Sequence, residues 1–219
     1  MKKVIISFVV LVTAICSSNA QVFIGGELGL KFSGGNTKNG STTIDSPTTF
    51  GIRFSPKVGF YLNDKFAIGG EVLLGTSIYN DKAVTNETTD TEVEWGIAPF
   101  VRYSVLEFGK FSVLFEGTAG LYGTSSKSKT GNTTVDLPST LSVGLIVAPL
   151  LSYELTEKIS LEMELDFLSL GIVSTTQTTK VSGSSDIKRN NTYFGVGADS
   201  NNVLNSDLGA VTIGFIYKF

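Results

Sequence analysis

Apolar residues fall on every second position through eight separate segments of this chain, and this alternation limits the fold more than any other feature. A period of two places alternate side chains on opposite faces of a β-strand, whereas a helix of the same sequence would carry them all round its axis. The sequence therefore predicts an all-β protein. The eight segments cover 22–32, 50–62, 66–78, 93–105, 111–121, 141–155, 159–167 and 211–219.

The connections between these segments alternate in length. Those at 63–65, 107–110 and 156–158 are short, and those at 33–49, 79–92, 124–140 and 174–207 are long and rich in Ser, Thr, Asn and Gly. Short turns on one side and long polar loops on the other are typical of transmembrane barrels. The pattern predicts an eight-stranded antiparallel up-and-down transmembrane β-barrel. An even number of strands places both termini on the short-turn, periplasmic side.

Three prolines repeat at one position before the short connections. Pro56, Pro99 and Pro149 stand seven residues before Asn63, Leu106 and Thr156, where the chain begins to turn, and each proline points to the apolar face. Proline cannot donate a hydrogen bond to a neighbouring strand, so each one predicts a bulge or bend in the wall.

The first twenty residues have a different character from the rest. Lys2 and Lys3 precede an apolar run from Val4 to Ile15, and Ser18-Asn19-Ala20 supplies small residues for cleavage. This pattern predicts a secretory signal peptide over 1–20 and a barrel domain over 21–219. Cys16, the only cysteine, offers an alternative interpretation, processing as a lipoprotein. Against it, Ile15 stands where a small residue is usual. Because the mature chain then lacks cysteine, its stability must come from packing and sheet closure.

The second face of the strands carries the charged residues. An eight-stranded lumen has room only for side chains or one small ligand, so it cannot hold the whole apolar set. We therefore expect apolar residues toward lipid, and small and charged residues inside. The expected lumen charge network is Glu27, Lys31, Arg53, Lys57, Glu71, Glu94, Arg102, Glu116, Glu154, Glu162, Glu164, Asp166 and Lys218.

Aromatic residues of the apolar face gather at two levels, as expected for rings at the two lipid interfaces. The turn-end belt consists of Phe60, Phe66, Tyr103, Phe111, Tyr153, Tyr217 and Phe219, and the loop-end belt of Phe32, Phe50, Trp95 and Phe167.

Four glutamates recur at one position of alternate strands. Glu27, Glu71, Glu116 and Glu164 each follow the first outward residue of their strand by five positions, so they should form a layer inside the barrel. Unpaired charge in a narrow lumen is costly, which favours a plug of ion pairs with the basic residues. The excess of acids over bases leaves a narrow, cation-favouring pore as the alternative.

Three stretches carry a resemblance to a known family. They are the opening QVFIGGELGLKF, the hairpin PKVGFYLNDKFAIGGEV and the closing VTIGFIYKF. With them the mature chain resembles the small outer-membrane β-barrel family, which includes OmpA/OmpX-like barrels and the "porin family" barrels of Bacteroidota. The resemblance implies a place in the Gram-negative outer membrane. It also implies that the barrel-assembly machinery reads the terminal residues Phe215, Tyr217 and Phe219.

Function is less constrained than fold. We expect a structural or surface-interaction barrel first and an ion or small-solute channel second. Enzyme activity is disfavoured because the chain has no histidine to move protons, and no loop carries a metal-binding motif. We expect no cofactor and no metal site.

The expected partners are outer-membrane lipid, the assembly machinery and an extracellular ligand of the long loops. We expect no bound nucleic acid and a monomeric barrel. The apolar stretch Thr192–Gly197 is either a strand extension, a loop-packing patch or an adhesion surface.

Overall fold

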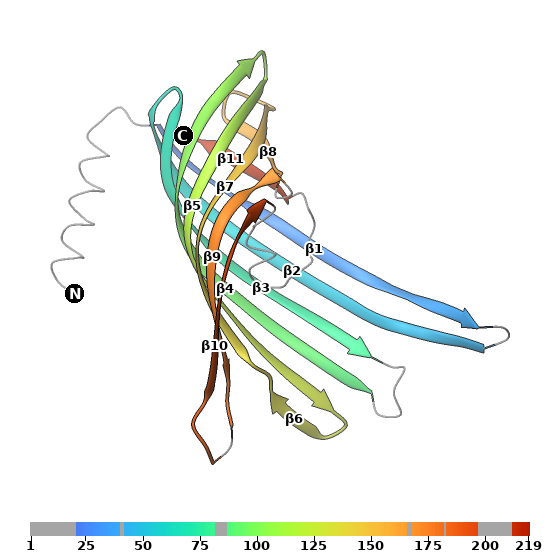
Figure 1. Ribbon diagram of the computed structural model, residues 1–219. Coiled ribbons are helices and arrows are strands. Elements are labelled where there is room, and N and C mark those ends of the chain that lie inside the picture. Colours follow the sequence, from blue (N-terminus) through green and yellow to red (C-terminus); the bar gives the residue numbers. More distant parts are fainter. Residues whose placement is uncertain (1–20, 40–41, 82–86, 166–167, 182, 197–211) are drawn as a thin grey trace.

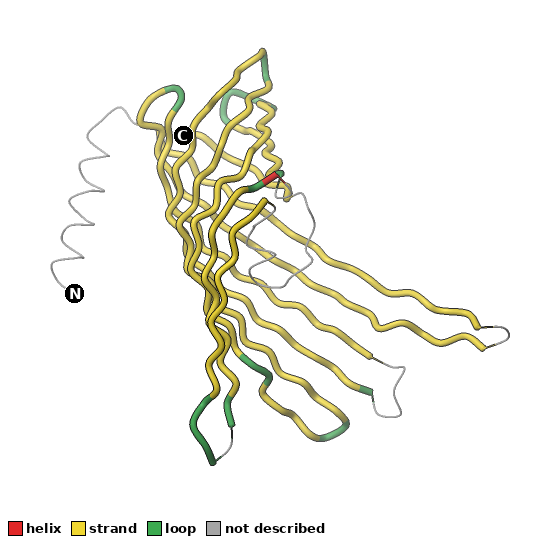
Figure 2. Tube along the Cα trace, in the orientation of Figure 1, coloured by secondary structure: helices red, strands yellow, loops and turns green. Residues whose placement is uncertain are grey.

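The fold is built almost entirely of antiparallel strands (Figure 2). The structure, a computed structural model, describes residues 21–39, 42–81, 87–165, 168–181, 183–196 and 212–219. The signal peptide expected over 1–20 lies outside these residues. The strands are β1 (Gln21–Asn39), β2 (Thr42–Asn63), β3 (Phe66–Asp81), β4 (Thr88–Phe108), β5 (Phe111–Thr130), β6 (Thr133–Asp136), β7 (Ser139–Glu154), β8 (Ile159–Glu164), β9 (Leu170–Thr179), β10 (Ile187–Val196) and β11 (Thr212–Lys218).

The sheet closes on itself as an eight-stranded barrel, which confirms the predicted fold. Each of β1 to β5 pairs with the next strand, β5 pairs with β7, β7 with β8, β8 with β11, and β11 with β1. The closing contact between β1 and β11 runs from Phe23↔Lys218 to Leu28↔Ile213. Toward the far end the strands fan apart, so that β1 and β2 diverge from β9 and β10 (Figure 1).

One end of the barrel, here called the turn end, carries the short connections. Asn63 Oδ1 accepts hydrogen bonds from the backbone N–H groups of Lys65 and Phe66, both at 2.9 Å. Gly109 has a φ of 63°, the left-handed conformation that glycine adopts without strain. Gln21, the first residue of β1, and Phe219 lie side by side at this end, because the side chain of Gln21 donates to the carbonyl of Phe219 at 3.4 Å.

The opposite end, the hairpin end, differs from the expected long loops. Most of 33–49 and 124–140 is paired strand, and β1 and β2 remain paired out to Asn39↔Thr42 beyond a register shift between Ser33 and Gly35. The segment expected as a loop over 174–207 contains the end of β9 and all of β10 within its described part. Threonine favours strands, and a hairpin satisfies backbone groups that a loop would leave to water, so these polar stretches extend the strands.

The stretch from Thr192 is wall rather than loop. Phe194 pairs with Ile172, and Val196 pairs with Leu170, whose own partners on β7 are Leu145 and Val147. Directly opposed residues share a face, so β10 places Phe194 and Val196 on the outer face.

The prolines interrupt the wall in two different ways. At Pro56 and Pro99, pairing with the next strand lapses but resumes in the same register. The ladder therefore has no bulge at these two positions, since a missing N–H need not shift the register, and the alternative expectation, a bend, stays a prediction. Beside Pro149 the register does shift, and the seventh barrel strand is divided there into β8 and β9. Other irregularities lie between Ser33 and Gly35, Tyr61 and Asn63, and Ser104 and Leu106.

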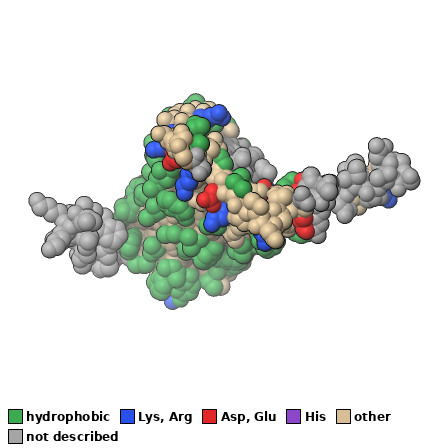
Figure 3. Space-filling model, turned by 90° about the horizontal axis from the view of Figure 1, so that it is seen from below, with side chains coloured by type: hydrophobic (Ala, Val, Ile, Leu, Met, Phe, Trp, Pro, Cys, Tyr) green, Lys and Arg blue, Asp and Glu red, His purple; other side chains and the backbone are tan. Residues whose placement is uncertain are grey.

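The two faces of the wall are separated by polarity. Along β4, exposed apolar residues such as Trp95, Ile97 and Val101 alternate with buried residues. Seen from the hairpin end, hydrophobic side chains cover much of the outer surface (Figure 3). No helix in the described ranges is long and apolar enough to cross a membrane.

Candidate functional site

The centre of the lumen is organised around the ammonium group of Lys57, from β2. Its Nζ lies within 4 Å of one carboxylate from each of four other strands, β1, β3, β5 and β8. Lys57 itself is almost fully buried, with 1% of its side chain exposed. The distances are 2.5 Å to Glu27, 3.4 Å to Glu71, 2.9 Å to Glu116 and 3.8 Å to Glu164.

These four carboxylates are the glutamates that repeat at one position of alternate strands. The alternation places their side chains inside, and the stagger of the barrel brings them to one level, around a single lysine. The contact between Lys57 and Glu71 follows directly from strand pairing, because the two residues are opposite each other in the β2–β3 ladder.

Arg102, from β4, forms the second cationic centre. Its Nε donates to Glu116 Oε2 at 2.5 Å, and its Nη1 donates to Glu162 Oε1 at 3.0 Å. Glu116 therefore bridges Arg102 and Lys57, with one oxygen for each. The two cations connect β1, β2, β3, β4, β5 and β8 through the lumen, which braces the wall from inside.

A separate pair lies nearer the hairpin end. Arg53 donates from Nη2 and Nε to Glu94 Oε2, at 2.8 and 3.2 Å, and both residues are buried. A guanidinium held by hydrogen bonds to a carboxylate has a fixed orientation, which is the usual form of a buried ion pair.

The remaining residues of the expected network lie elsewhere. Lys31 is half-buried on β1 toward the hairpin end, and Lys218 lies at the turn end with its Nζ 5.8 Å from the Tyr61 ring centre. Glu154 lines the turn-end opening together with Lys218. Asp166 lies outside the described residues.

The lumen also holds aromatic side chains that were not expected there. Phe23 and Phe100 are buried, with ring centres 6.3 Å apart. The Arg102 guanidinium carbon lies 5.3 Å from the Phe23 ring centre and 5.1 Å from that of Phe100, within the range of cation–π attraction. Tyr122 packs with Leu73 and Ala98 in a second buried cluster.

Each of these inward rings lies over a glycine on the neighbouring strand. Phe23 pairs directly with Gly59, Phe100 with Gly69, and Tyr122 with Gly96. A Cβ added to any of the three glycines would collide with the facing ring. An inward aromatic opposite an inward glycine is thus the signal that could have located these residues from the sequence.

Two spaces lie on either side of the charged centre. A cavity of about 40 Å³, enough for one or two water molecules, is lined by residues including Glu27, Glu71 and Tyr122. A wider opening of about 460 Å³ at the turn end is lined by Tyr61, Arg102, Glu154 and Lys218 among others. The Arg102–Glu116 pair and the two phenylalanine rings lie between them.

The chemistry of this arrangement is that of a closed, charged core. Glu162 and Glu164 are neighbouring carboxylates on β8, and such a pair can serve hydrolysis in enzymes. Here each forms an ion pair with a different cation, Glu162 with Arg102 and Glu164 with Lys57. Among the described residues no group of three or more acidic or cysteine side chains is placed to hold a metal ion.

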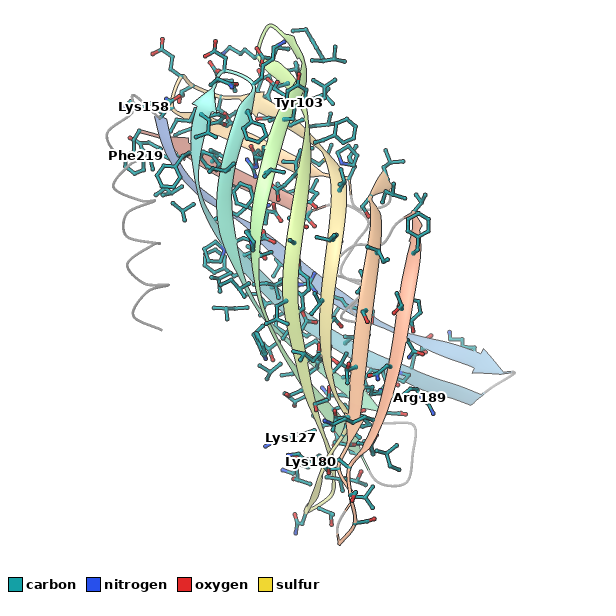
Figure 4. All side chains as sticks on the ribbon, turned by 60° about the vertical axis from the view of Figure 1, so that its left-hand side comes forward. Tyr103, Lys127, Lys158, Lys180, Arg189 and Phe219 are labelled. Atoms are coloured by element: carbon teal, nitrogen blue, oxygen red, sulfur yellow. The ribbon has the colours of Figure 1, made fainter. Side chains whose placement is uncertain are left out.

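The turn end carries paired aromatic residues on the outer face. Phe66 is opposite Tyr103, and the Phe111 and Tyr153 ring centres are 4.6 Å apart. Figure 4 shows Tyr103, Lys158 and Phe219 gathered at this end. The last residue is fixed to the first strand, because the Phe219 N–H donates to the Val22 carbonyl at 3.0 Å.

Neither the comparison with protein-family models nor that with curated proteins finds a match. Solved structures that are similar in fold include Ail, the attachment invasion locus protein of Yersinia pestis, at 10% identity, with 92% of this chain and 100% of that chain covered and a TM-score of 0.44. Neisserial surface protein A gives 13% identity, the same coverage and a TM-score of 0.35. A major outer membrane protein from Thermus thermophilus gives 14% identity, the same coverage and a TM-score of 0.47. These neighbours are small outer-membrane β-barrels.

Proposed function

We propose that this chain is an integral outer-membrane barrel with a structural or surface-interaction role, whose lumen is closed by ion pairs. The observation that carries this proposal is the inversion of polarity across the wall. Leu145, Ile97 and Phe54 are each more than half exposed on the outside, whereas Lys57, Arg102 and Glu116 are buried inside. Such a wall is suited to lipid, because the closed ladder satisfies the backbone and the apolar face needs no water.

The closed lumen follows from the length and position of the two basic side chains. Lys57 reaches carboxylates on both sides of the barrel, and Arg102 continues the barrier between Phe23 and Phe100. Moving an ion past this centre would require several short ion pairs to separate in a low-dielectric space. We therefore expect the barrel not to conduct steadily.

The proposal also covers the orientation of the barrel, its relatives, its assembly and its surface interactions. We place the turn end in the periplasm and the long hairpins outside the cell, as the lengths of the connections suggest. We propose OmpA/OmpX-like or Bacteroidota "porin family" relatives on the sequence resemblance, assembly by the barrel-assembly machinery, and no enzyme activity. Surface interaction would fall to the hairpins, and removing the β9–β10 hairpin should abolish binding of an extracellular ligand.

A narrow cation channel is the second candidate, and the acid excess favours it. Around Lys57 and Arg102 the structure places five carboxylates, those of Glu27, Glu71, Glu116, Glu162 and Glu164, against two cations. Rings of carboxylates select cations in other pores.

Planar-bilayer recording separates the two candidates. The refolded mature chain should give no steady single-channel steps, and Lys57→Met should produce cation-selective steps because the carboxylates lose their central counter-ion. Lys158→Met, which removes a lysine at an exposed turn, is the control and should remain silent. Steady steps in the unmodified protein that vanish on neutralising Glu71 and Glu116 would establish the channel instead.

A further inference from the structure

The charges at the hairpin end are divided between the two faces of the wall. On β3 and β4, Asp81, Asp90 and Glu92 occupy positions that alternate with the outward Ile78, Val93 and Trp95, so they are on the lumen side. Glu92 accepts a hydrogen bond from Ser126 there, at 3.1 Å. In contrast, the lysines of β5 and β10 are on the outer side.

Four exposed lysines make up this outer group, which we call the lysine surface. Lys127 and Lys129 continue the outward alternation of Leu121 on β5, and Lys188 continues that of Phe194 on β10. Lys180 follows the last residue of β9, two positions beyond the outward Thr178.

The register places these lysines on one sector of the barrel. Lys188 is opposite Thr178, and Thr178 is opposite Ser139 on β7, which is in turn the neighbour of β5. Three strand spacings separate β5 from β10, or about 14 Å at roughly 4.8 Å each. Figure 4 shows Lys127 and Lys180 at the same end, far from Tyr103 and Lys158.

The negative charge beside the lysine surface is smaller than its positive charge. Asp136 on β6 is opposite Lys127, Asp186 precedes β10, and Glu87 precedes β4, two positions beyond Thr89, which is opposite Lys129. The other outward positions nearby carry hydroxyl groups, including Ser125, Thr176 and Thr178. Four cations against three carboxylates leave this sector with a net positive charge on the side that faces outward from the barrel.

The distance of the lysine surface from the aromatic residues of the outer face shows where it lies relative to the lipid boundary. Trp95 is opposite Gly123, and Lys127 is four residues farther along β5. Four strand residues cover about 13 Å. With the tilt usual for barrel strands, Lys127 therefore lies roughly 10 Å above the aromatic level, among lipid headgroups.

We propose that the lysine surface binds the phosphate groups of anionic lipids in the surrounding leaflet. This inference rests on the proposed insertion into a membrane. The lysines project from the outer wall beyond its apolar band, where their ammonium groups can reach headgroup phosphates. A soluble acidic polymer would meet the tips of the hairpins, where Lys180 lies, whereas Lys127, Lys129 and Lys188 point outward from the strands toward the leaflet.

Lipid cross-linking from single cysteines tests the proposal, because the mature chain has no cysteine of its own. A benzophenone label is attached to Ser125→Cys, within the lysine surface, or to Thr48→Cys, an exposed outward position on β2 that is opposite Asn80 and three strand spacings from β5. Each barrel is placed in vesicles of phosphatidylcholine with one-fifth phosphatidylglycerol. The ratio of phosphatidylglycerol to phosphatidylcholine adducts should be about fivefold higher at Ser125→Cys, and should fall in high salt.

Replacing Lys127, Lys129, Lys180 and Lys188 by Gln should bring the ratio at Ser125→Cys down to that at Thr48→Cys. Equal ratios at the two sites in the otherwise unmodified barrel would overturn the inference. It would also be overturned if the four replacements abolished binding of soluble polyphosphate and left the lipid ratio unchanged. Flotation with the vesicles is scored separately: a barrel that fails to float contradicts the proposed membrane insertion itself.

Discussion

Glu116 Oε1 lies 2.9 Å from Lys57 Nζ, and this contact joins β5 to β2, two strands that are not neighbours in the sheet. The other oxygen of Glu116 holds Arg102. A single buried carboxylate therefore fixes both cations of the lumen, and the charged centre acts as one unit rather than as separate pairs.

Glu116→Gln should lower the free energy of unfolding by about 3 kcal/mol, because removing one partner leaves buried charge without compensation. Urea unfolding of the barrel in phospholipid vesicles measures this. Glu107→Gln serves as the control, since Glu107 lies at the turn end with Ser104 as its hydrogen-bond partner. Equal midpoints for both variants would show that Glu116 does not brace the wall.

Gly59→Ala should destabilise the barrel by about 1–3 kcal/mol, the usual cost of overpacking, because the new methyl group collides with the Phe23 ring. Gly29→Ala is a matched control on a lumen-side position. Its Cβ would meet only Arg53 Cβ at 3.5 Å, which is an ordinary contact. Thermal unfolding in detergent compares the two, and a similar loss at both positions would mean that the ring is free to move aside.

Leu145→Arg should destabilise the membrane-inserted barrel by about 2–4 kcal/mol, because it places a charge on the outer face near the middle of the apolar band. Val135→Arg, on the short hairpin strand β6, should have almost no effect, although Val135 is similarly exposed, at 56% against 60%. Unfolding in vesicles is the measurement. Equal tolerance of arginine at both positions would contradict a lipid-facing band.

Removal of Phe219 should impair assembly more than stability. The resemblance to outer-membrane barrels implies that this residue is read by the assembly machinery. In the folded barrel it contributes one edge contact with Tyr217, at 5.0 Å, one backbone hydrogen bond to Val22 and one hydrogen bond from the Gln21 side chain. Assembly into membranes that contain the machinery should fall severalfold, while refolding into pure lipid vesicles should be nearly normal. Leu62→Ala, also exposed at the turn end, is the control. Loss of refolding in pure lipid would assign Phe219 a structural role.

The sequence by itself determined the number of barrel strands, the position of the short turns and the face on which each side chain lies. A period of two shows directly on which face of a strand each side chain lies. Alternation alone is therefore enough to place Glu27, Lys57 and Glu116 inside the barrel. The sequence also contains a less obvious signal, the pairing of inward aromatics such as Phe100 with inward glycines such as Gly69.

Only the tertiary structure decided which of the inward side chains meet. Alternation fixes the face of a residue but not its height, because height depends on the stagger between neighbouring strands. That stagger brings four glutamates to Lys57 and leaves Lys31 and Lys218 elsewhere. It likewise decided that the polar stretches at the hairpin end pair as strands. A threonine-rich segment forms a paired strand only when another strand lies next to it. The sequence of one segment does not show whether such a neighbour is present.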